Sequence, residues 1–253
     1  MSADDGSTAS RHDPALAPFL SLHDVDAGYG ETQVLRGVSL DVKQGEIVSL
    51  VGRNGAGKTT TLRTITGVVA PTAGSITFRG ESIDSLDAVD TAKRGISLVP
   101  EERRIFPKLT VRENLEIAAY GGAADREGLS IDAVLDTFEN LAERTDNPGS
   151  SLSGGEQQML TIGRALVSGA DLILLDEPTE GLAPYIVQDV VDAVRDLNER
   201  GITVLLVEQN VHVALELADR NYVIDQGEIV WEGSSRALEA DEEVLDKYLG
   251  ITA

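Results

Sequence analysis

One eight-residue run constrains the fold of this chain more than any other feature: Gly52-Arg53-Asn54-Gly55-Ala56-Gly57-Lys58-Thr59. It matches the pattern G-x-x-x-x-G-K-[ST] in full, with an apolar run before it and a helical segment after it. Glycines let such a loop curl so that successive backbone N–H groups converge on phosphate oxygens. The start of the following helix adds the positive end of its dipole. The run therefore predicts a phosphate-binding loop between a strand and a helix.

The residues of this loop have different expected tasks toward ATP. The ammonium of Lys58 is expected to reach the β and γ phosphates, and the hydroxyl of Thr59 is expected to ligate Mg²⁺. The backbone amides supply the remaining contacts. The candidate phosphate-binding residues are Gly52, Asn54, Gly55, Ala56, Gly57, Lys58, Thr59 and Thr60.

Two carboxylates follow a second apolar run. Leu172–Leu175 has the length of a buried strand, and Asp176 and Glu177 come directly after it. Ligands of α/β sheets bind beyond the carboxyl ends of the strands, so both acids are expected near the phosphates. Asp176 is predicted to hold Mg²⁺, and Glu177 is predicted to polarise the attacking water. Carboxylates are also common at solvated strand ends, so this prediction depends on the neighbouring phosphate loop.

Continuous apolar runs of strand length alternate with helical segments along the chain. Such runs are typical of parallel strands covered on both faces, and the alternation predicts an α/β fold with a mainly parallel sheet. The expected buried strands are 47–51, 96–99, 172–175, 202–207 and 222–224. The expected helices are 59–67, 154–168 and 185–200, with Gly201 as the stop of the last one.

Other segments alternate apolar and polar residues, as half-buried antiparallel strands do. These are 19–23, 38–42 and 75–78, which predict an antiparallel β subdomain. Residues 71–74 are expected to form a loop, and Gln226-Gly227 a hairpin turn. Residues 110–150 are rich in Ala, Leu, Glu and Asp, which predicts a small helical insertion divided at Gly121-Gly122. We expect one domain over residues 19–253 and a disordered tail over residues 1–18.

Charge and composition exclude several classes of protein. The chain has 43 acidic and 21 basic residues, a net charge of −22, which repels nucleic acid at long range. Adaptation to a high-salt cytoplasm is one explanation of this charge. With no cysteine, disulfide scaffolds and thiolate metal sites are excluded. No run approaches the length of a membrane span, and the first residues lack the pattern of a secretory signal. We expect a cytoplasmic protein that reaches a membrane only through a partner.

A glycine pair at a helix start carries a further signal, in Leu152-Ser153-Gly154-Gly155-Glu156-Gln157-Gln158. Ser153 with Glu156 three residues later forms a capping-box pattern, which by itself explains these two residues. A capping box does not need two glycines, however, and bare N–H groups at a helix start favour an anion.

This run resembles the signature sequence of the ATP-binding cassette (ABC) family. Together with the phosphate loop and Asp176-Glu177, it makes the chain resemble that family from about Phe19 to the end. The resemblance implies a P-loop NTPase-type fold, ATP and Mg²⁺ as ligands, and a head-to-tail homo- or heterodimer that sandwiches two ATP molecules. It implies that Ser153, Gly154, Gly155 and Gln157 act on the nucleotide of the other subunit. It also implies that Tyr29 stacks on adenine; the alternative is an ordinary core or surface tyrosine.

The chain departs from the general family pattern at several positions. Glu101 stands where a Gln usually contacts Mg²⁺ and water, and Gln209 stands at a switch position that is usually His. Gln209 can hydrogen-bond a γ-phosphate but cannot carry a proton at neutral pH. The loop from Thr179 to Pro184 lacks its usual Asp, and the helical insertion is short. Three runs resemble the second ATPase subunit of branched-chain amino acid importers: Pro-Glu before Arg103–Pro107, Val-Glu-Gln-Asn, and Gly-Leu-Ala-Pro. In that branch of the family, a Gly usually stands at the position of Glu102.

We therefore predict an ATPase subunit at the inner face of the membrane, bound to permease subunits and acting indirectly with a solute-binding protein. Glu177, Gln209 and Lys58 are the predicted catalytic residues. Four alternatives stay open: an importer of urea or short amides, an ABC ATPase without a permease, a nucleotide-gated dimer that does not turn over, and an unrelated phosphate-loop enzyme. A GTPase of the last kind would need an Asn-Lys-x-Asp motif, which the chain lacks.

Overall fold

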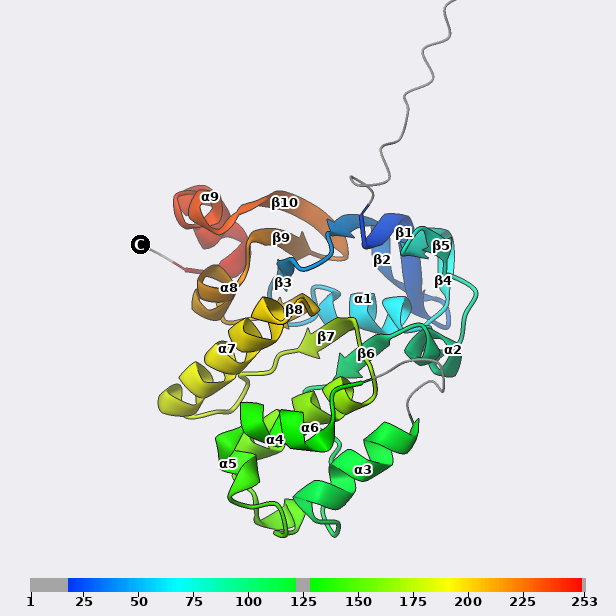
Figure 1. Cartoon of the computed structure of the whole chain (residues 1–253). Coiled ribbons are helices and arrows are strands. Elements are labelled where there is room, and N and C mark those ends of the chain that lie inside the picture. The colour runs from blue at the N-terminus through cyan, green and yellow to red at the C-terminus, as the bar shows by residue number, and fades with distance from the viewer. Residues whose placement is uncertain (1–17, 122–127, 252–253) are drawn as a thin grey trace, which may run out of the picture.

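The computed structural model describes residues 18–121 and 128–251. The predicted tail lies outside the described residues except for Pro18, and so does Gly122 of the predicted break in the helical insertion. The described chain forms two β-sheets and the helices that pack on them (Figure 1). None of the helices in these two ranges is long and apolar enough to cross a membrane.

The larger sheet has six strands in the order β10-β9-β3-β8-β7-β6. Strands β3, β8, β7 and β6 are parallel neighbours, β9 runs parallel to β3, and β10 is antiparallel to β9. Every residue of β3, β7 and β8 is buried, which explains their continuous apolar runs. The strands are β3 (Ile47–Val51), β6 (Ile96–Val99), β7 (Leu172–Asp176), β8 (Thr203–Glu208), β9 (Arg220–Asp225) and β10 (Glu228–Ser234). The predicted hairpin turn at Gln226-Gly227 is confirmed.

The smaller sheet is antiparallel, in the order β2-β1-β4-β5. Its strands are β1 (Leu20–Tyr29), β2 (Thr32–Val42), β4 (Pro71–Phe78) and β5 (Glu81–Ser82). The predicted loop at residues 71–74 is wrong, because these residues begin β4 and pair with β1 through Pro71 and Ala73. Pro71 is tolerated as the first residue of the strand, and Gly74 adopts φ +83° where the register shifts. Turn-forming residues here mark a bulge rather than a loop.

Two large apolar cores cover the two faces of the larger sheet, and a smaller cluster packs around Val51, Val223 and Leu238. One core joins the smaller sheet and α1 (Lys58–Ile65) to residues such as Val48, Leu50 and Leu205. The other joins the opposite face to α6 (Gly154–Val167) and α7 (Pro184–Glu199). Helix α1 therefore lies between the sheets, and the end of β3 leads directly into it (Figure 1).

The segment between β6 and α6 is helical. It holds α3 (Val111–Gly121), α4 (Ile131–Thr137) and α5 (Glu139–Ala142), which pack against α6 at the lower end of Figure 1. The sequence predicted one break here, whereas the described residues also divide at Phe138. Shorter helices are α2 (Ala88–Lys93), α8 (Val211–Leu217), α9 (Ser235–Glu239) and α10 (Glu242–Val244), followed by a π-helical turn, Leu245–Leu249.

Candidate nucleotide-binding site

The loop between β3 and α1 has a conformation that depends on its glycines. Gly55 and Gly57 adopt φ values of +80° and +116°, which side chains disfavour. Gly57 caps α1 without a side-chain hydrogen bond, so no side chain covers the first N–H groups of the helix. A Cβ on Gly52 would lie 2.4 Å from the carbonyl oxygen of Ile224 in β9. The glycines thus permit both the curl of the loop and its close packing on the sheet.

Lys58 is buried, with 4 % of its side chain exposed, and its ammonium contacts three acceptors. Its Nζ donates to the carbonyl oxygens of Gly52 at 2.8 Å and Arg53 at 3.2 Å. It also forms an ion pair with Glu177 Oε1 at 3.0 Å. Two predicted catalytic residues that are far apart in sequence are therefore in direct contact.

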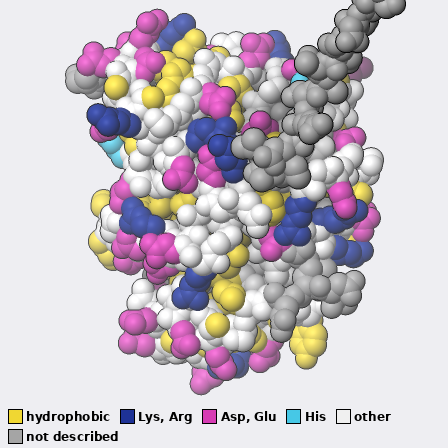
Figure 2. Space-filling view, turned by 45° about the horizontal axis from the view of Figure 1, so that its top comes forward, with side chains coloured by type: hydrophobic (Ala, Val, Ile, Leu, Met, Phe, Trp, Pro, Cys, Tyr) yellow, Lys and Arg dark blue, Asp and Glu magenta, His cyan; other side chains and the backbone are white. Residues whose placement is uncertain are grey.

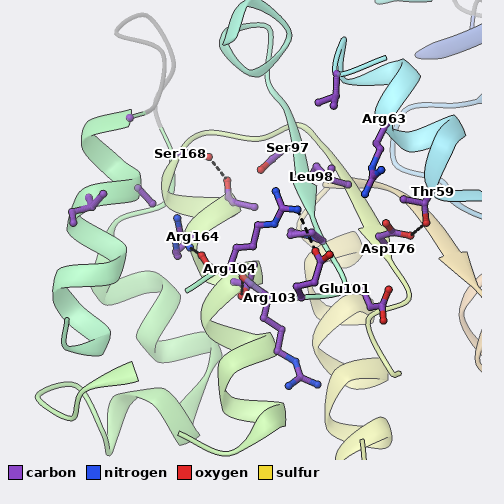
Figure 3. A pocket seen from close by; sticks show the side chains of 18 residues that line it. Thr59, Arg63, Ser97, Leu98, Glu101, Arg103, Arg104, Arg164, Ser168 and Asp176 are labelled. Carbon is purple, nitrogen blue, oxygen red and sulfur yellow. Dashed lines mark hydrogen bonds and ion pairs between the residues drawn. The ribbon is translucent and has the colours of Figure 1, made fainter. Parts of the chain in front are cut away.

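Thr59 and Asp176 form a second polar pair beside the first. Thr59 Oγ1 donates to Asp176 Oδ1 at 3.0 Å, and Figure 3 shows the two side chains pointing toward one another. Burial raises the pKa of Asp176 to about 6, helped by the nearby charges of Glu177 and Glu101 and opposed by the bond from Thr59. A cation at this position would favour the ionised carboxylate.

Glu177 lies at the end of β7 in a strained backbone conformation. Its φ is +47°, a value that costs a non-glycine residue of the order of 1–3 kcal/mol. Its backbone N–H donates to the carbonyl oxygen of Val207 in β8 at 2.9 Å, which extends the β7–β8 pairing by one bond. The neighbouring strand thus helps to fix the orientation of the Glu177 carboxylate toward Lys58.

A pocket of about 510 Å³ opens over these residues. It brings together residues of the phosphate loop, Glu101 from the end of β6 and Glu177 from the end of β7. Its lining residues are Val34, Asn54, Gly55, Gly57, Lys58, Thr59, Thr60, Glu101, Glu177 and Glu180. Of the other predicted loop residues, Ala56 is buried and its carbonyl accepts from Gly227 N–H at 2.8 Å.

Tyr29 and Gln209 do not line this pocket. Tyr29 ends β1 with 45 % of its surface exposed, and its hydroxyl accepts a hydrogen bond from Arg63 of α1 at 3.2 Å. Gln209 follows β8 directly and is exposed. Their predicted contacts with adenine and γ-phosphate stay predictions.

Glu208, the residue before Gln209, is not among the site residues predicted from the sequence. Glu208 is 2 % exposed, and its carboxylate accepts hydrogen bonds from Thr179, two residues after Glu177, and from Asn210. Burial raises its pKa, and these hydrogen bonds oppose the shift. A signal was present: a carboxylate ends an otherwise apolar strand, as Asp176 does in β7.

The predicted signature begins α6 at some distance along the chain from the phosphate loop, and its residues do not line the phosphate pocket. The capping box is confirmed: Ser153 Oγ accepts from Glu156 N–H at 3.3 Å, and Ser153 N–H donates to Glu156 Oε2 at 2.7 Å. The side-chain amide of Gln157 donates to the carbonyl oxygen of Leu152 at 3.1 Å. The guanidinium of Arg103 lies beside Gly154, where it would be 3.3 Å from an added Cβ.

The structure gives a packing reason for the second glycine. A Cβ on Gly155 would lie 2.2 Å from Ile186 Cγ2, so α6 and α7 approach as closely as they do only because this position lacks a side chain. Gly154 is less constrained, since its nearest heavy atom, Leu182 Cδ2, would be 3.2 Å away. The glycine pair therefore combines tight helix packing at Gly155 with an accessible helix start at Gly154.

Replacing Gly155 by alanine is expected to lower the free energy of unfolding by about 1–3 kcal/mol, because the added methyl overpacks the α6–α7 contact. Adding Ile186→Ala should recover part of this loss, and Gly154→Ala should cost less than Gly155→Ala. Chemical denaturation of the variants measures all three. Equal losses at both glycines, or no recovery in the double variant, would contradict the packing role.

Charges of both signs lie on one face of the molecule (Figure 2). On the face drawn in Figure 2, Lys and Arg side chains are interspersed among Asp and Glu rather than joined in one stripe. A continuous basic stripe is the usual footprint of a nucleic-acid binder, so this face gives no support to such a role.

Comparison with known proteins places these features in a family. The family model described as "ABC transporter" matches residues 35–180. The chain is 46% identical over 232 residues to BraG of Pseudomonas aeruginosa, a "high-affinity branched-chain amino acid transport ATP-binding protein", covering 92% of this chain and 100% of that one. It is 38% identical to LivF of Archaeoglobus fulgidus, described as probable in the same transport role, covering 90% and 97%. It is 36% identical to LptB of Escherichia coli, of the lipopolysaccharide export system, covering 91% and 97%.

Solved structures agree with the fold. The crystal structure of the ADP conformation of an ATP-binding cassette from an ABC transporter superposes with a TM-score of 0.80 at 27% identity, covering 91% of this chain and 98% of that one. A dimeric cassette in a post-hydrolysis state, bound to ADP and Pi, superposes with a TM-score of 0.73 at 29% identity, covering 86% and 99%. The predicted fold class is thereby confirmed.

Proposed function

The chain belongs to the ABC transporter family of ATPases, and we propose that it is the ATP-hydrolysing subunit of a membrane importer for branched-chain amino acids. The observation that carries the proposed chemistry is the joint placement of Lys58, Thr59 and Glu177 at one pocket, with Asp176 hydrogen-bonded to Thr59 beside it. The likeness to BraG over the whole of that protein supports the solute class. Nucleotide binding closes a dimer of ATPase subunits, and hydrolysis reopens it.

Lys58 and the loop amides bind the β and γ phosphates. The ammonium already lies among the carbonyl oxygens of its own loop and Glu177, so it is held where the phosphates of ATP enter. The uncovered N–H groups at the start of α1 and the dipole of the helix add positive potential. In a chain of net charge −22, these local groups supply the attraction that a triphosphate needs.

Thr59 and Asp176 fit Mg²⁺. A hydroxyl and a carboxylate within 3.0 Å of each other are hard oxygen donors of the kind that Mg²⁺ selects together with phosphate oxygens. When bound, Mg²⁺ would neutralise negative charge on the phosphates of ATP.

Glu177 acts as the base that orients and polarises the attacking water. It lies in the pocket, 3.0 Å from the ammonium that contacts the transferred phosphate, so its carboxylate faces the reacting group. Gln209, at the end of the adjacent strand β8, senses the γ-phosphate by hydrogen bonding. Tyr29 offers an exposed ring for the adenine, and its hydrogen bond from Arg63 restrains that ring.

The signature completes the site of a second subunit. Ser153, Gly154, Gly155 and Gln157 lie outside the phosphate pocket of their own chain, and an accessible helix start is a favourable partner for a phosphate. A solved cassette that is dimeric and bound to ADP and Pi supports the pairing of two ATPase subunits. The partner is a second copy of this chain or a sibling ATPase subunit.

A groove beside the nucleotide pocket suits a permease. The groove, of about 570 Å³, lies between the loop that follows β6, helix α3 and helix α6, and Figure 3 shows Arg104 and Arg164 within it. Its surroundings include the exposed apolar residues Val68, Ile117 and Phe106, and Arg164 stacks on Phe106 at 4.8 Å. Glu101 lines both this groove and the phosphate pocket. A displacement of Glu101 on nucleotide binding would therefore alter its contacts with a permease helix bound in the groove.

We place the subunit at the inner face of the membrane, bound to permease subunits that in turn receive solute from a binding protein.

The test is uptake of radiolabelled leucine by cells lacking this gene, complemented with the wild-type chain or with Glu177→Gln. We expect leucine uptake to fall in the deletion strain and to return only with the wild-type chain. Normal leucine uptake with lost urea uptake would favour the alternative solute class. Normal uptake of both, with the chain absent from the membrane fraction, would favour an ATPase without a permease.

A further inference from the structure

We propose that Glu208 is a positioning residue for ATP hydrolysis: its buried carboxylate ties the loop after Glu177 to the loop that carries Gln209. This inference rests on the proposed role of Glu177 as the base. Glu208 itself does not line the phosphate pocket, so it acts through its neighbours rather than on the nucleotide.

The contacts of Glu208 divide between its two oxygens. Oε1 accepts from the Thr179 hydroxyl at 2.7 Å and from the Thr179 N–H at 3.3 Å. Oε2 accepts from the Asn210 N–H at 3.1 Å. One carboxylate therefore bridges the residue two positions after Glu177 and the residue directly after Gln209. We call this arrangement the Glu208 bridge.

The bridge acts on a backbone that needs restraint. Glu177 has a φ of +47°, a conformation that persists only where the surrounding contacts determine it. On one side, the Glu177 N–H is bound to the Val207 carbonyl oxygen at 2.9 Å. On the other side, the bridge fixes Thr179, two residues after Glu177 in the chain. Together, these hydrogen bonds tie the chain at Glu177 to Val207 of β8 and the chain at Thr179 to Glu208 at the end of β8.

The cost of burying this carboxylate supports a specific role. Glu208 is 2 % exposed and Thr179 is 7 % exposed, so the bridge is shielded from water. Burial raises the pKa of Glu208, the direction expected where the loss of hydration disfavours the ionised form. An apolar residue at the end of β8 would avoid this cost but could not accept bonds from two loops.

Two substitutions separate the two halves of the bridge. Thr179→Val removes the hydroxyl donor and keeps the shape of the side chain. Glu208→Gln keeps one oxygen for Thr179 but places an NH₂ group against the Asn210 N–H, where two donors meet. We expect each to lower kcat for phosphate release about ten- to hundredfold, because small misplacements of a catalytic group have effects of this size. The dissociation constant for Mg-ADP, measured by calorimetry on the full chain, should change less than about threefold.

Three further variants make the test specific. Thr179→Ser restores the hydroxyl and should recover most of the turnover lost in Thr179→Val. Thr203→Val removes a buried hydroxyl at the opposite end of the same strand, where it accepts from Gly45 N–H at 3.0 Å. It should lower the melting temperature without the loss in kcat. Glu177→Gln in the same assay reports on the proposed base independently.

The outcomes are distinct. If the folded Thr179→Val and Glu208→Gln variants keep wild-type kcat, the bridge has no positioning role and the inference is overturned. The same holds if Thr203→Val loses as much turnover as they do. If Glu208→Gln does not fold, the Thr179→Val and Thr179→Ser pair decides alone. Normal turnover in Glu177→Gln would instead refute the proposed base, which is a different failure.

Discussion

Glutamine in place of Glu177 is expected to lower the rate of ATP hydrolysis about 10²–10⁴-fold, the usual contribution of a positioned general base. The amide keeps the shape of the side chain but cannot accept a proton from water. Binding of ATP should not weaken, because the substitution also removes the ion pair between Glu177 and Lys58 at 3.0 Å. The ammonium is then free of a competing carboxylate when a phosphate approaches. The variant should therefore hold ATP and accumulate as a closed dimer.

Phosphate release under single-turnover conditions measures the first effect, and size-exclusion chromatography with Mg-ATP measures the second. The matched control is Glu199→Gln, which neutralises an exposed carboxylate at the end of α7, far along the chain from the pocket. It should hydrolyse ATP like the wild type. Steady-state hydrolysis by Glu177→Gln at the wild-type rate would remove Glu177 from the role of base.

Methionine in place of Lys58 is expected to weaken ATP binding roughly 30-fold to several thousand-fold, which corresponds to about 2–5 kcal/mol for truncating a buried, hydrogen-bonded charge. Methionine keeps the length of the side chain and removes the charge and its three donors. The loss has two parts. The phosphates lose an ammonium, and Glu177, with 12 % of its side chain exposed, is left without its cation beside them.

The double variant Lys58→Met with Glu177→Gln separates these parts. If the unpaired Glu177 contributes by repelling the phosphates, the double variant should bind ATP more tightly than Lys58→Met alone. Lys93→Met is the control, since Lys93 is an exposed lysine of α2 paired with Asp90 at 2.9 Å. Calorimetric titration with ATP measures all three. An affinity for ATP in Lys58→Met equal to that of the wild type would contradict the assignment of the phosphate loop.

Predictions from the sequence were correct where all the residues that a structural feature requires lie in one short segment. The phosphate loop is such a case, because its glycines, lysine and threonine lie within eight consecutive residues, and its curl depends on positive φ values at Gly55 and Gly57. The capping box at Ser153 is another, since its two bonds join residues three positions apart. The buried parallel strands were recognisable because both of their faces are covered and their residues are continuously apolar.

Local reasoning was wrong at residues 71–74, where Pro71 and Gly74 suggested a loop. The pairing of this segment with β1 depends on a strand more than forty residues earlier in the chain, and no local pattern reveals such a partner. The second glycine of the signature shows the same limit. Its packing on Ile186 exists only because α7 crosses α6 at that point.

The amino-acid sequence by itself determined the fold class, the phosphate loop and the two acids at the end of β7, because each is encoded in consecutive residues whose backbone or polarity requirements are local. Only the tertiary structure decided which of these groups meet: Lys58 with Glu177, Thr59 with Asp176, and Glu208 with Thr179. Those contacts arise from the order of strands in the sheet, where β7 and β8 are neighbours and β3 lies on the other side of β8. Strand order depends on the burial of both faces of the whole sheet at once. The sequence of a single segment does not specify which strands lie beside it.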